Sequence, residues 1–446
     1  MRIIVVGGGE IGFALARELA GDHSLSVVDA NPAIGKRFEG LDVAFLSGSG
    51  TSPELLDRAG VGRADILVAC TGLDEVNMVV CAIANRLGTP RTICFVSRDD
   101  FTGADGSAEA VRKHFGIERI IWPEAQLADE IERIIGAPGA IDAEAFAGGR
   151  IRLLEFRLEQ DSPLTAAPLA ALHIPAGTLI VAVKRREVIS IPRGDASLKP
   201  GDKIFVMGTP EGMSEVLPLI QGGPQRQTTQ LVTIIGGGDV GFRLAQRLEA
   251  SDVEVRLIES DPQRGEVVAA SLRRTLVLNG DGTDLELLES EDIGRSDVLV
   301  SVIDNDERNL FASLLARQLG VRKIITRVSR PANLRLFERV GIDVALSARG
   351  AAVASLVHHI QGGRAHLLAV LEEGQATIVE VQVPPVFEAR ALMAMKAPPQ
   401  SIVGAILRGG EVIIPRGADQ IRPHDRLIVF AAADAVRMVR NYFGAA

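Results

Sequence analysis

The sequence predicts an α/β protein in which a parallel-sheet domain followed by a smaller α+β domain occurs twice. Residues 2–12 read RIIVVGGGEIG and residues 231–241 read LVTIIGGGDVG, so each copy is an apolar strand that leads into G-x-G-x-x-G. An acid closes the next strand in both copies, Asp29 after LSVV and Glu259 after VRLI. A single match would be weak evidence. Two matches in the same strand–turn–helix context predict a duplicated Rossmann-like dinucleotide-binding domain.

Length and composition limit the possible functions. The 446 residues carry a formal net charge of −9, which argues against nucleic-acid binding, because that function relies on clustered lysine and arginine. We expect no transmembrane helix, since no stretch approaches 18 uncharged apolar residues, and no signal peptide, since MRIIVV enters the first strand directly. Cys70, Cys81 and Cys94 lack the spacing of zinc ligands, and we expect buried, reduced thiols.

The elements after each glycine pattern follow one order. In both copies the first helix has a single apolar stripe, formed by Ile11, Leu15 and Leu19 or by Val240, Leu244 and Leu248. Further strands follow at VAFLSG, ILVAC and TICFV in the first copy, and at RTLVLNG, VLVSVI and KIITRVS in the second. Helices are expected at 74–88 and 306–320. This alternation of buried β-branched strands with helices predicts a parallel sheet that is covered on both faces.

A second repeat follows each parallel-sheet domain. Helical segments near 123–136 and 347–361 lead into modules that contain VISIPRGDASLKPGDKIFV (188–206) and EVIIPRGADQIRPHDRLIVF (411–430). Short strands around these turns predict small α+β units, and QGGPQRQTTQ (221–230) reads as a linker between the halves. We therefore expect four domains, at 1–122, 140–222, 231–347 and 364–446. We also expect the two connecting helices to pack between the parallel-sheet domains.

The glycine loops and their acids predict NAD(H) as the ligand. Gly7 permits the tight turn, Gly9 lets the backbone approach the phosphates, and Gly12 lets helix and strand pack closely. The free N–H groups of the following helix can hold a diphosphate. The carboxylates of Asp29 and Glu259 can accept from both ribose hydroxyls and would repel a 2′-phosphate, which favours NAD over NADP.

Other residues near the predicted clefts are small or polar. The third strands end in GSGTSPELL (48–56) and GDGTDLELL (280–288), where small residues could pass beneath an adenine and Asp281 could accept from its amine. Thr71 could contact the ribose or the adenine edge, or simply serve as a turn hydroxyl. Glu10 and Asp239 lie in the phosphate loops, where they disfavour additional negative charge unless a divalent cation offsets it.

The sequence shows no recognisable catalytic motif. None of its seven histidines falls in such a motif, and G-x-S-x-G, H-E-x-x-H and Walker sequences are absent. The modules of about 75 residues are small for catalytic domains. We therefore expect a protein that binds nucleotide without catalysing a reaction, and no metal site.

The chain resembles the TrkA family, the peripheral nucleotide-binding subunits of bacterial Trk potassium uptake systems. The resemblance covers essentially the full length and is carried by GGGEIG, GSGTSPELL, TGLDEVNMV and IPRG-x-x-x-L-x-PGD in that order. It implies an RCK N-terminal domain and an RCK C-terminal domain in each half. DEVN (74–77) and DERN (306–309) match the family's D-E-x-N, in which Asp74 and Asp306 are also plausible helix N-caps.

The resemblance also implies that the two nucleotide sites differ. The family's fifth strand usually carries an arginine near the nucleotide. The second half has Arg327 at this place, whereas the first half has Phe95, with Arg98 as an uncertain substitute. Conversely, Thr71 matches the family and Ile303 does not.

The expected nucleotide contacts combine the residue patterns with the resemblance. In the first half they are Gly7, Gly8, Gly9, Glu10, Ile11, Gly12, Asp29, Ser49, Gly50, Thr71 and Gly72. In the second half they are Gly236, Gly237, Gly238, Asp239, Val240, Gly241, Glu259, Asp281, Gly282 and Arg327.

The function that the resemblance implies is regulatory. Such subunits form rings, typically homotetramers, on the cytoplasmic face of a potassium-translocating membrane protein, and nucleotide occupancy of the ring acts on the pore. NAD(H) is the expected ligand, with ATP or ADP as possible competitors. Two alternatives stay open: an NAD-dependent oxidoreductase, and a ligand-sensing subunit of another cation channel or antiporter.

Overall fold

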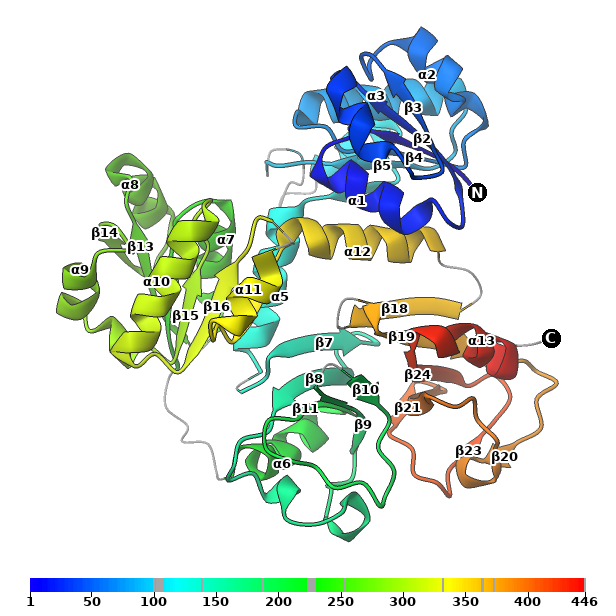
Figure 1. Ribbon diagram of the computed structural model, residues 1–446, viewed down its shortest axis with the longest axis vertical. Coiled ribbons are helices and arrows are strands. Elements are labelled where there is room, and N and C mark those ends of the chain that lie inside the picture. Colours follow the sequence, from blue (N-terminus) through cyan, green and yellow to red (C-terminus); the bar gives the residue numbers. More distant parts are fainter. Residues whose placement is uncertain are drawn as a thin grey trace. The chain divides into compact units, whose positions relative to one another are not determined.

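The computed structural model divides the chain into two compact units. Residues 1–129, 232–251 and 255–357 form the first unit, and residues 130–231, 252–254 and 358–446 form the second. The structure describes residues 1–98, 101, 107–137, 139–186, 188–222, 230–251, 253–330, 333–361, 365–371 and 374–444. Most of the predicted linker at 221–230 therefore lies outside the described residues. Both parallel-sheet domains belong to the first unit, and both antiparallel modules belong to the second (Figure 1).

The first parallel-sheet domain has six strands in the order β3-β2-β1-β4-β5-β6. Its strands are β1 (Arg2–Val6), β2 (Ser24–Asp29), β3 (Val43–Ser47), β4 (Ile66–Ala69), β5 (Thr92–Phe95) and β6 (Arg119–Ile121). Its helices are α1 (Glu10–Leu19), α2 (Pro53–Ala59), α3 (Asp74–Leu87), α4 (Ser107–Phe115) and α5 (Pro123–Ile135). Strands β2 and β3 are added on one side of β1, and β4 to β6 are added on its other side. Right-handed crossovers in both directions place helices on both faces of the sheet. The predicted Rossmann-like fold is confirmed.

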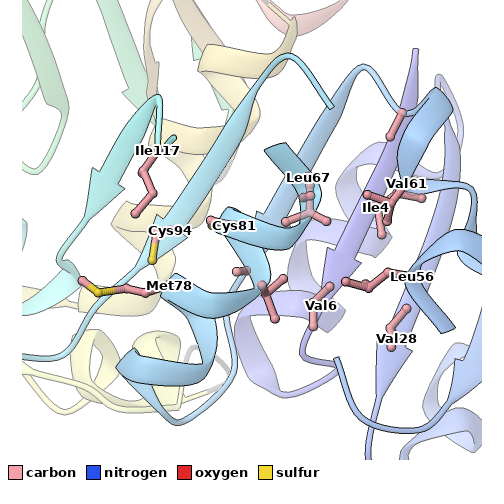
Figure 2. Close-up of a cluster of buried hydrophobic side chains, with 14 of the residues drawn as sticks. Ile4, Val6, Val28, Leu56, Val61, Leu67, Met78, Cys81, Cys94 and Ile117 are labelled. Atoms are coloured by element: carbon pink, nitrogen blue, oxygen red, sulfur yellow. The ribbon is translucent and has the colours of Figure 1, made fainter. Parts of the chain in front are cut away.

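The core of this domain is made of the apolar runs that predicted its strands. Ile4, Val6 and Leu67 of the sheet are at most 1% exposed and pack against Leu56 and Val61 (Figure 2). Cys81 and Cys94 belong to the same cluster, and the structure confirms that all three thiols are buried. Burial raises the pKa of Cys70 to about 12, so its thiol stays protonated at neutral pH.

The second parallel-sheet domain repeats this arrangement, with strand order β14-β13-β12-β15-β16-β17. Its strands are β12 (Gln230–Ile235), β13 (Val253–Glu259), β14 (Leu276–Asn279), β15 (Val298–Ser301), β16 (Lys323–Arg327) and β17 (Val344–Leu346). Its helices are α7 (Asp239–Leu248), α8 (Pro262–Ser271), α9 (Leu285–Ser290), α10 (Asp306–Leu319), α11 (Leu334–Arg339) and α12 (Ala348–Gln361). The two predicted connecting segments are thus helices α5 and α12. Asp129 on α5 contacts Arg247 of α7 at 3.2 Å, which agrees with packing of α5 on the second domain.

The second unit consists of two α+β modules. The first contains β7 (Asp142–Phe146), β8 (Ile151–Arg157), β9 (Thr178–Arg185), β10 (Val188–Ser190), β11 (Lys203–Gly208) and α6 (Pro210–Gln221). The second contains β18 (Ala365–Leu371), β19 (Ala376–Gln382), β20 (Arg390–Ala391), β21 (Ser401–Arg408), β22 (Glu411–Ile413), β23 (Gln420–Ile421), β24 (Arg426–Ala432) and α13 (Val436–Gly444). Their five-stranded antiparallel sheets have the orders β10-β9-β11-β8-β7 and β18-β19-β24-β21-β22. The predicted small α+β units are confirmed, and the four residue ranges stay our proposal for the domain boundaries.

The two modules share one hydrophobic core. Residues of both sheets belong to a single buried cluster, in which the rings of Phe205 and Phe430 lie 6.0 Å apart. A Cβ on Gly404 would come within 2.4 Å of the sulfur of Met207, so the sheets approach too closely there for a larger residue. Such a shared core means that the modules stabilise each other.

The second aspartate-containing turn of each module holds an ion pair. Asp202, from the sequence PGD, accepts two hydrogen bonds of 2.7 Å from Arg185 and one from the amide of Lys199. Asp425, from PHD, accepts in the same way from Arg408 and from the amide of Arg422. Both aspartates are at most 2% exposed. The family-like L-x-PGD sequence is therefore explained by a buried carboxylate that fastens a turn to a strand.

Raising the pH from 5 to 8.5 should lower the free energy of unfolding of the second unit. Burial raises the pKa of Glu130 to about 8 and that of Glu144 to about 7. The negative charge of Asp142 raises both pKa values further, and the positive charge of Arg133 partly opposes this. Between the unfolded and folded pKa values the folded state retains protons that the unfolded chain has released, so stability falls as pH rises. At about 1.4 kcal/mol per pKa unit we expect a loss of roughly 4–7 kcal/mol, the lower figure if Glu130 alone titrates as described.

Chemical denaturation followed by circular dichroism at several pH values measures this slope. Glu130→Gln removes one titrating group and should flatten the dependence between pH 5 and 8. The exposed Glu159 provides the control, because Glu159→Gln should leave the slope as in the wild type. An equal slope in Glu130→Gln and the wild type would contradict the assignment.

Among the helices in the described part of the chain, none combines the length and the apolar character that crossing a membrane requires.

Candidate functional site: two glycine loops and a cleft

The first glycine loop joins β1 to α1 through a turn that only glycine fits. Gly7 has φ +110°, and a Cβ there would lie 2.7 Å from the carbonyl carbon of Cys70. A Cβ on Gly12 would lie 1.8 Å from the carbonyl oxygen of Gly7. In contrast, Gly9 is the N-cap of α1 and has no described atom within 4 Å of its would-be Cβ. The loop is thus packed beneath and open above, at the helix end that attracts anions.

The predicted ribose acids lie directly against the glycine loops in both halves. Asp29, at the end of β2, accepts a 2.6 Å hydrogen bond from the amide of Gly8 and a 2.8 Å bond from that of Asn31. Glu259, at the end of β13, accepts from the amide of Gly237 at 2.6 Å and from that of Asp261 at 2.8 Å. These bonds orient both carboxylates beside the phosphate loops, where a ribose would follow the diphosphate.

Replacing Asp29 with alanine should weaken binding of NADH at the first glycine loop by about 1–3 kcal/mol, because ribose hydroxyls lose a charged acceptor. Calorimetric titration of the full chain measures this change. Asp22→Ala is the control, since Asp22 lies in the turn between α1 and β2, at the opposite edge of the sheet. Unchanged NADH affinity in Asp29→Ala would refute the role of Asp29.

The loops after β3 and β14 come close beneath the first strand of each sheet. A Cβ on Gly50 would lie 2.3 Å from Val6, and one on Gly282 would lie 2.1 Å from Ile235. Their neighbours differ between halves. The Ser49 and Thr51 hydroxyls share a 2.9 Å hydrogen bond. In contrast, the Asp281 carboxylate accepts a hydrogen bond from the Thr283 hydroxyl and forms a 2.7 Å ion pair with Arg308. The Asp281 carboxylate is therefore occupied by protein donors, and its proposed contact with an adenine amine stays a prediction.

The D-E-x-N aspartates are not helix N-caps, contrary to the expectation that they could be. The N-cap residues are Leu73 and Asn305, and Asp74 and Asp306 are the first helical residues. Asp74 accepts from the amides of Ser97 and Arg98, and Asp306 accepts from that of Ser329. The aspartates thus fix the loop after the fifth strand, because that loop presents free N–H groups to the start of the helix.

The asparagine of the same motif joins two strand ends. Asn77 accepts from the amide of Thr71 at 2.8 Å and donates to the carbonyl oxygen of Phe95 at 3.0 Å. Asn309 makes the matching bonds to Ile303 and Arg327. The Thr71 hydroxyl lies 2.7 Å from the Asn77 carboxamide oxygen, which agrees with a turn hydroxyl. Sequence reasoning missed this structural role of the asparagine.

A cleft of about 420 Å³ lies at the carboxyl edge of the second sheet. This volume falls within the range of small-molecule sites. Of the predicted contacts it is lined by Gly236, Gly238, Asp239, Val240, Glu259, Gly282 and Arg327. Gly241 packs instead beneath the loop, where a Cβ would lie 1.9 Å from the carbonyl oxygen of Gly236. Most of the residues predicted to contact the nucleotide in the second half therefore line one cavity. Their contact with a ligand stays a prediction.

The cleft has further charged residues that the sequence analysis missed. Arg264 donates to the carbonyl oxygen of Gly237 at 2.9 Å, and Arg308 pairs with Asp281. Glu124 reaches the cleft from α5, and burial raises the pKa of its carboxyl. A comparison of DERN with DEVN could have revealed Arg308.

In the first half, the arginines near the glycine loop pair with acids at other positions. Arg37, in the 3₁₀ helix η1 (Pro32–Phe38), pairs with Glu10 of the phosphate loop at 2.9 Å. Arg98 lies in the loop after β5, where it contacts the carboxylates of Asp74 and Glu75. Phe95 is buried. Hence Arg98 serves the D-E-x-N helix in this structure, rather than replacing Arg327.

Comparisons with known proteins agree with this duplicated arrangement. The TrkA-N domain model matches residues 3–123 and 232–348, and the TrkA-C domain model matches residues 153–221 and 377–444. The "Trk system potassium uptake protein TrkA homolog 1" of Methanosarcina mazei is 37% identical over 99% of this chain and 100% of its own length. A TrkA homolog of Archaeoglobus fulgidus is 35% identical with the same coverage. Among solved structures, the "GsuK channel bound to NAD" has a TM-score of 0.62 at 19% identity, covering 100% of this chain and 79% of that one.

Proposed function

This chain belongs to the TrkA family, and we propose that it is the NAD(H)-binding regulatory subunit of a Trk-type potassium uptake system. In this proposal it forms a ring, as a homotetramer, on the cytoplasmic face of a potassium-translocating membrane protein. Nucleotide occupancy shifts the ring between two conformations. The relatives at 35–37% identity are named as potassium uptake proteins over nearly the same length, which supports this role.

The observation that carries the proposal is the pair of glycine loops, each with an acidic side chain hydrogen-bonded to it from the end of the next strand. Asp29 and Glu259 are each held by two backbone amides beside an open helix N-terminus. A carboxylate in this place accepts from unmodified ribose hydroxyls and repels a 2′-phosphate, which favours NAD(H) over NADP(H). A solved structure of the same fold is that of a channel bound to NAD, so the fold can hold this ligand.

Regulation without catalysis needs only different affinities for the two conformations. A ligand that binds one ring state tenfold more tightly supplies about 1.4 kcal/mol per site. Several such sites in one ring act together, and their combined effect can move an equilibrium that one site cannot. Duplication of the nucleotide domain within one chain doubles the number of sites per subunit.

Potassium flux in proteoliposomes tests the function. The Trk-type membrane subunit of the same organism is reconstituted with and without this protein, and rubidium uptake is measured over a range of NADH and NAD⁺. We expect flux to depend on dinucleotide only when the protein is present, and the dependence to weaken in Asp29→Ala. Nucleotide-independent flux would contradict the proposal. Turnover of NADH with a substrate, in the absence of membranes, would favour the oxidoreductase instead.

A further inference from the structure

The cleft at the carboxyl edge of the second sheet, here called the second cleft, is lined by residues of both parallel-sheet domains. Most of its lining comes from the second domain, but Ser97 and Glu124 belong to the first half of the chain. Ser97 lies in the loop after β5, and Glu124 is in the first turn of α5. Both domains belong to one compact unit. A ligand in this cleft therefore meets the two domains at once.

Helix α5 is held against the helix that begins at the second glycine loop. The Asp129 carboxylate of α5 lies 3.2 Å from the Arg247 guanidinium and 3.8 Å from that of Arg243, both on α7. The Arg243 guanidinium also lies over the Trp122 ring, 5.0 Å from its centroid. These contacts orient the start of α5 relative to α7, so that Glu124 lies beside the phosphate loop of the other domain.

Glu124 has a buried oxygen without a hydrogen bond. Among the described residues, no donor reaches its Oε2 atom. Burial raises the pKa of this carboxyl and the charge of Asp239 raises it too, whereas its own backbone amide, Arg327 and Arg349 lower it. A buried acceptor without a donor is costly. A ligand that brings a hydroxyl or an amide N–H to this oxygen therefore gains a hydrogen bond without displacing an existing one.

The strand order shows which part of a dinucleotide would reach Glu124. Glu259 ends β13, on one side of the central strand β12, and Arg327 ends β16, on the other side. A dinucleotide crosses the crevice where the strand order reverses, with its adenosine ribose at the acid that ends the second strand. The nicotinamide half then extends over β15 and β16, where Arg327 and Glu124 line the same cavity.

We infer that Glu124 and Ser97 of the first domain bind the nicotinamide nucleoside half of a dinucleotide in the second cleft. Both are then specificity-determining residues, because they distinguish a dinucleotide from a mononucleotide such as ADP. NAD(H) joins the two domains, whereas ADP ends at the phosphate loop of the second domain. This inference rests on the proposed function for the dinucleotide itself, and it adds which residues of the chain recognise its second half.

The chemistry of the two ligands supports this distinction. The nicotinamide nucleoside carries ribose hydroxyls and a carboxamide N–H₂ group, which are hydrogen-bond donors. A terminal phosphate offers acceptors and brings negative charge, which the Glu124 carboxylate repels at short range. The Ser97 hydroxyl donates to Asp74 at 3.1 Å, so its oxygen is left to accept. Both first-domain groups therefore present acceptors to the nicotinamide nucleoside.

The D-E-x-N motif of the first half positions Ser97. Asp74 accepts from the Ser97 amide at 3.0 Å, from its hydroxyl at 3.1 Å and from the Arg98 amide at 3.1 Å. Asp74 is 5% exposed and is not one of the residues that line the second cleft. It is thus a positioning residue, which acts on the cleft of the other domain through Ser97.

Calorimetry on the full chain with the first glycine loop closed tests the assignment. Gly9→Leu places a side chain over that loop, where a Cβ meets no described atom within 4 Å, so the remaining binding reports the second cleft. In this background Glu124→Ala should weaken NADH binding about fivefold to a hundredfold, because ribose or amide donors lose their acceptor. ADP should bind as before or more tightly, since a negative charge is removed.

Glu54→Ala is the matched control. Glu54 follows a proline in the first turn of α2, as Glu124 does in that of α5, so both substitutions remove the same charge from the start of a helix. Glu54→Ala should leave NADH binding in the Gly9→Leu background unchanged. An equal loss in both variants would overturn the inference, as would an equal loss of NADH and ADP affinity in Glu124→Ala.

Asp74→Ala separates positioning from folding. In the Gly9→Leu background we expect NADH affinity to fall and ADP affinity to stay, because Ser97 lies on the nicotinamide side. Asp74→Asn should restore part of the NADH affinity, since its amide oxygen can still accept from the Ser97 amide. Equal losses of both ligands, without recovery in Asp74→Asn, would show that Asp74 supports the fold only and would contradict its positioning role.

Failure of the proposed function gives a different result. Gly238→Leu closes the second glycine loop as Gly9→Leu closes the first, since a Cβ on Gly238 also meets no described atom within 4 Å. NADH that binds neither variant nor the wild type would refute NAD(H) as the ligand of this chain, and the inference with it. NADH binding that is lost in Gly238→Leu but unchanged in Glu124→Ala would refute the inference alone.

Discussion

Gly12→Ala should destabilise the first parallel-sheet domain by about 3 kcal/mol or more and abolish dinucleotide binding to its cleft. The added Cβ would lie 1.8 Å from the carbonyl oxygen of Gly7, a backbone atom that cannot rotate away. Helix α1 must then move off β1, and overpacking of this kind costs about 1–3 kcal/mol even where side chains can adjust. Denaturation followed by the fluorescence of Trp122, the single tryptophan, measures the change, since Trp122 belongs to this domain's core.

Gly9→Ala separates folding from binding at the same loop. Gly9 has φ −65°, and no described atom lies within 4 Å of its would-be Cβ, so stability should stay within about 1 kcal/mol of the wild type. The methyl group projects into open space above the loop, where the diphosphate is expected, and NADH affinity should fall. Equal stability of Gly12→Ala and Gly9→Ala would contradict this account of the loop.

Asn309→Leu should cost about 3–5 kcal/mol in the second domain, because it leaves several buried groups without partners. The Asn309 side chain is 0% exposed and holds the backbone amide and carbonyl of Ile303, at 2.8 and 2.7 Å. It also donates to the carbonyl oxygen of Arg327 and contacts the Ser301 hydroxyl. Its loss separates the ends of β15 and β16, so cleft binding should weaken together with stability.

An exposed asparagine on the same sheet serves as the control. Asn279 donates to the carbonyl oxygen of Glu259 at 3.0 Å from a solvent-exposed position. Asn279→Leu should change the free energy of unfolding by less than about 1 kcal/mol. Thermal unfolding followed by circular dichroism compares the two variants. Similar destabilisation by both would show that Asn309 has no special role.

The parallel sheets were predictable because their information is local. Each strand is a short β-branched run, and each glycine loop follows directly from its strand. Asp29 and Glu259 could be placed beside the glycine loops because the carboxyl ends of parallel strands meet at one edge of the sheet. Gly50 and Gly282 were expected to let the chain pass close beneath an adenine. Both lie tight against the first strand of their sheet, and the contact with an adenine stays a prediction.

The features that were missed depend on contacts between distant residues. Arg308 and Asp281 are 27 positions apart, and nothing in the run around either of them indicates the pair. The aspartates of D-E-x-N resemble N-caps in sequence. Their carboxylates instead accept hydrogen bonds from backbone amides in a loop 23 residues later. The shared core of the two modules was likewise hidden, since alternating apolar residues show that a sheet face is buried but not what covers it.

A crystal structure of the full chain with NADH tests the central claim most directly. The account predicts a dinucleotide in the first cleft, with its diphosphate on the amides at the start of α1 and the adenosine ribose hydroxyls at the Asp29 carboxylate. An empty first cleft at saturating NADH, with its glycine loop unchanged, would contradict it.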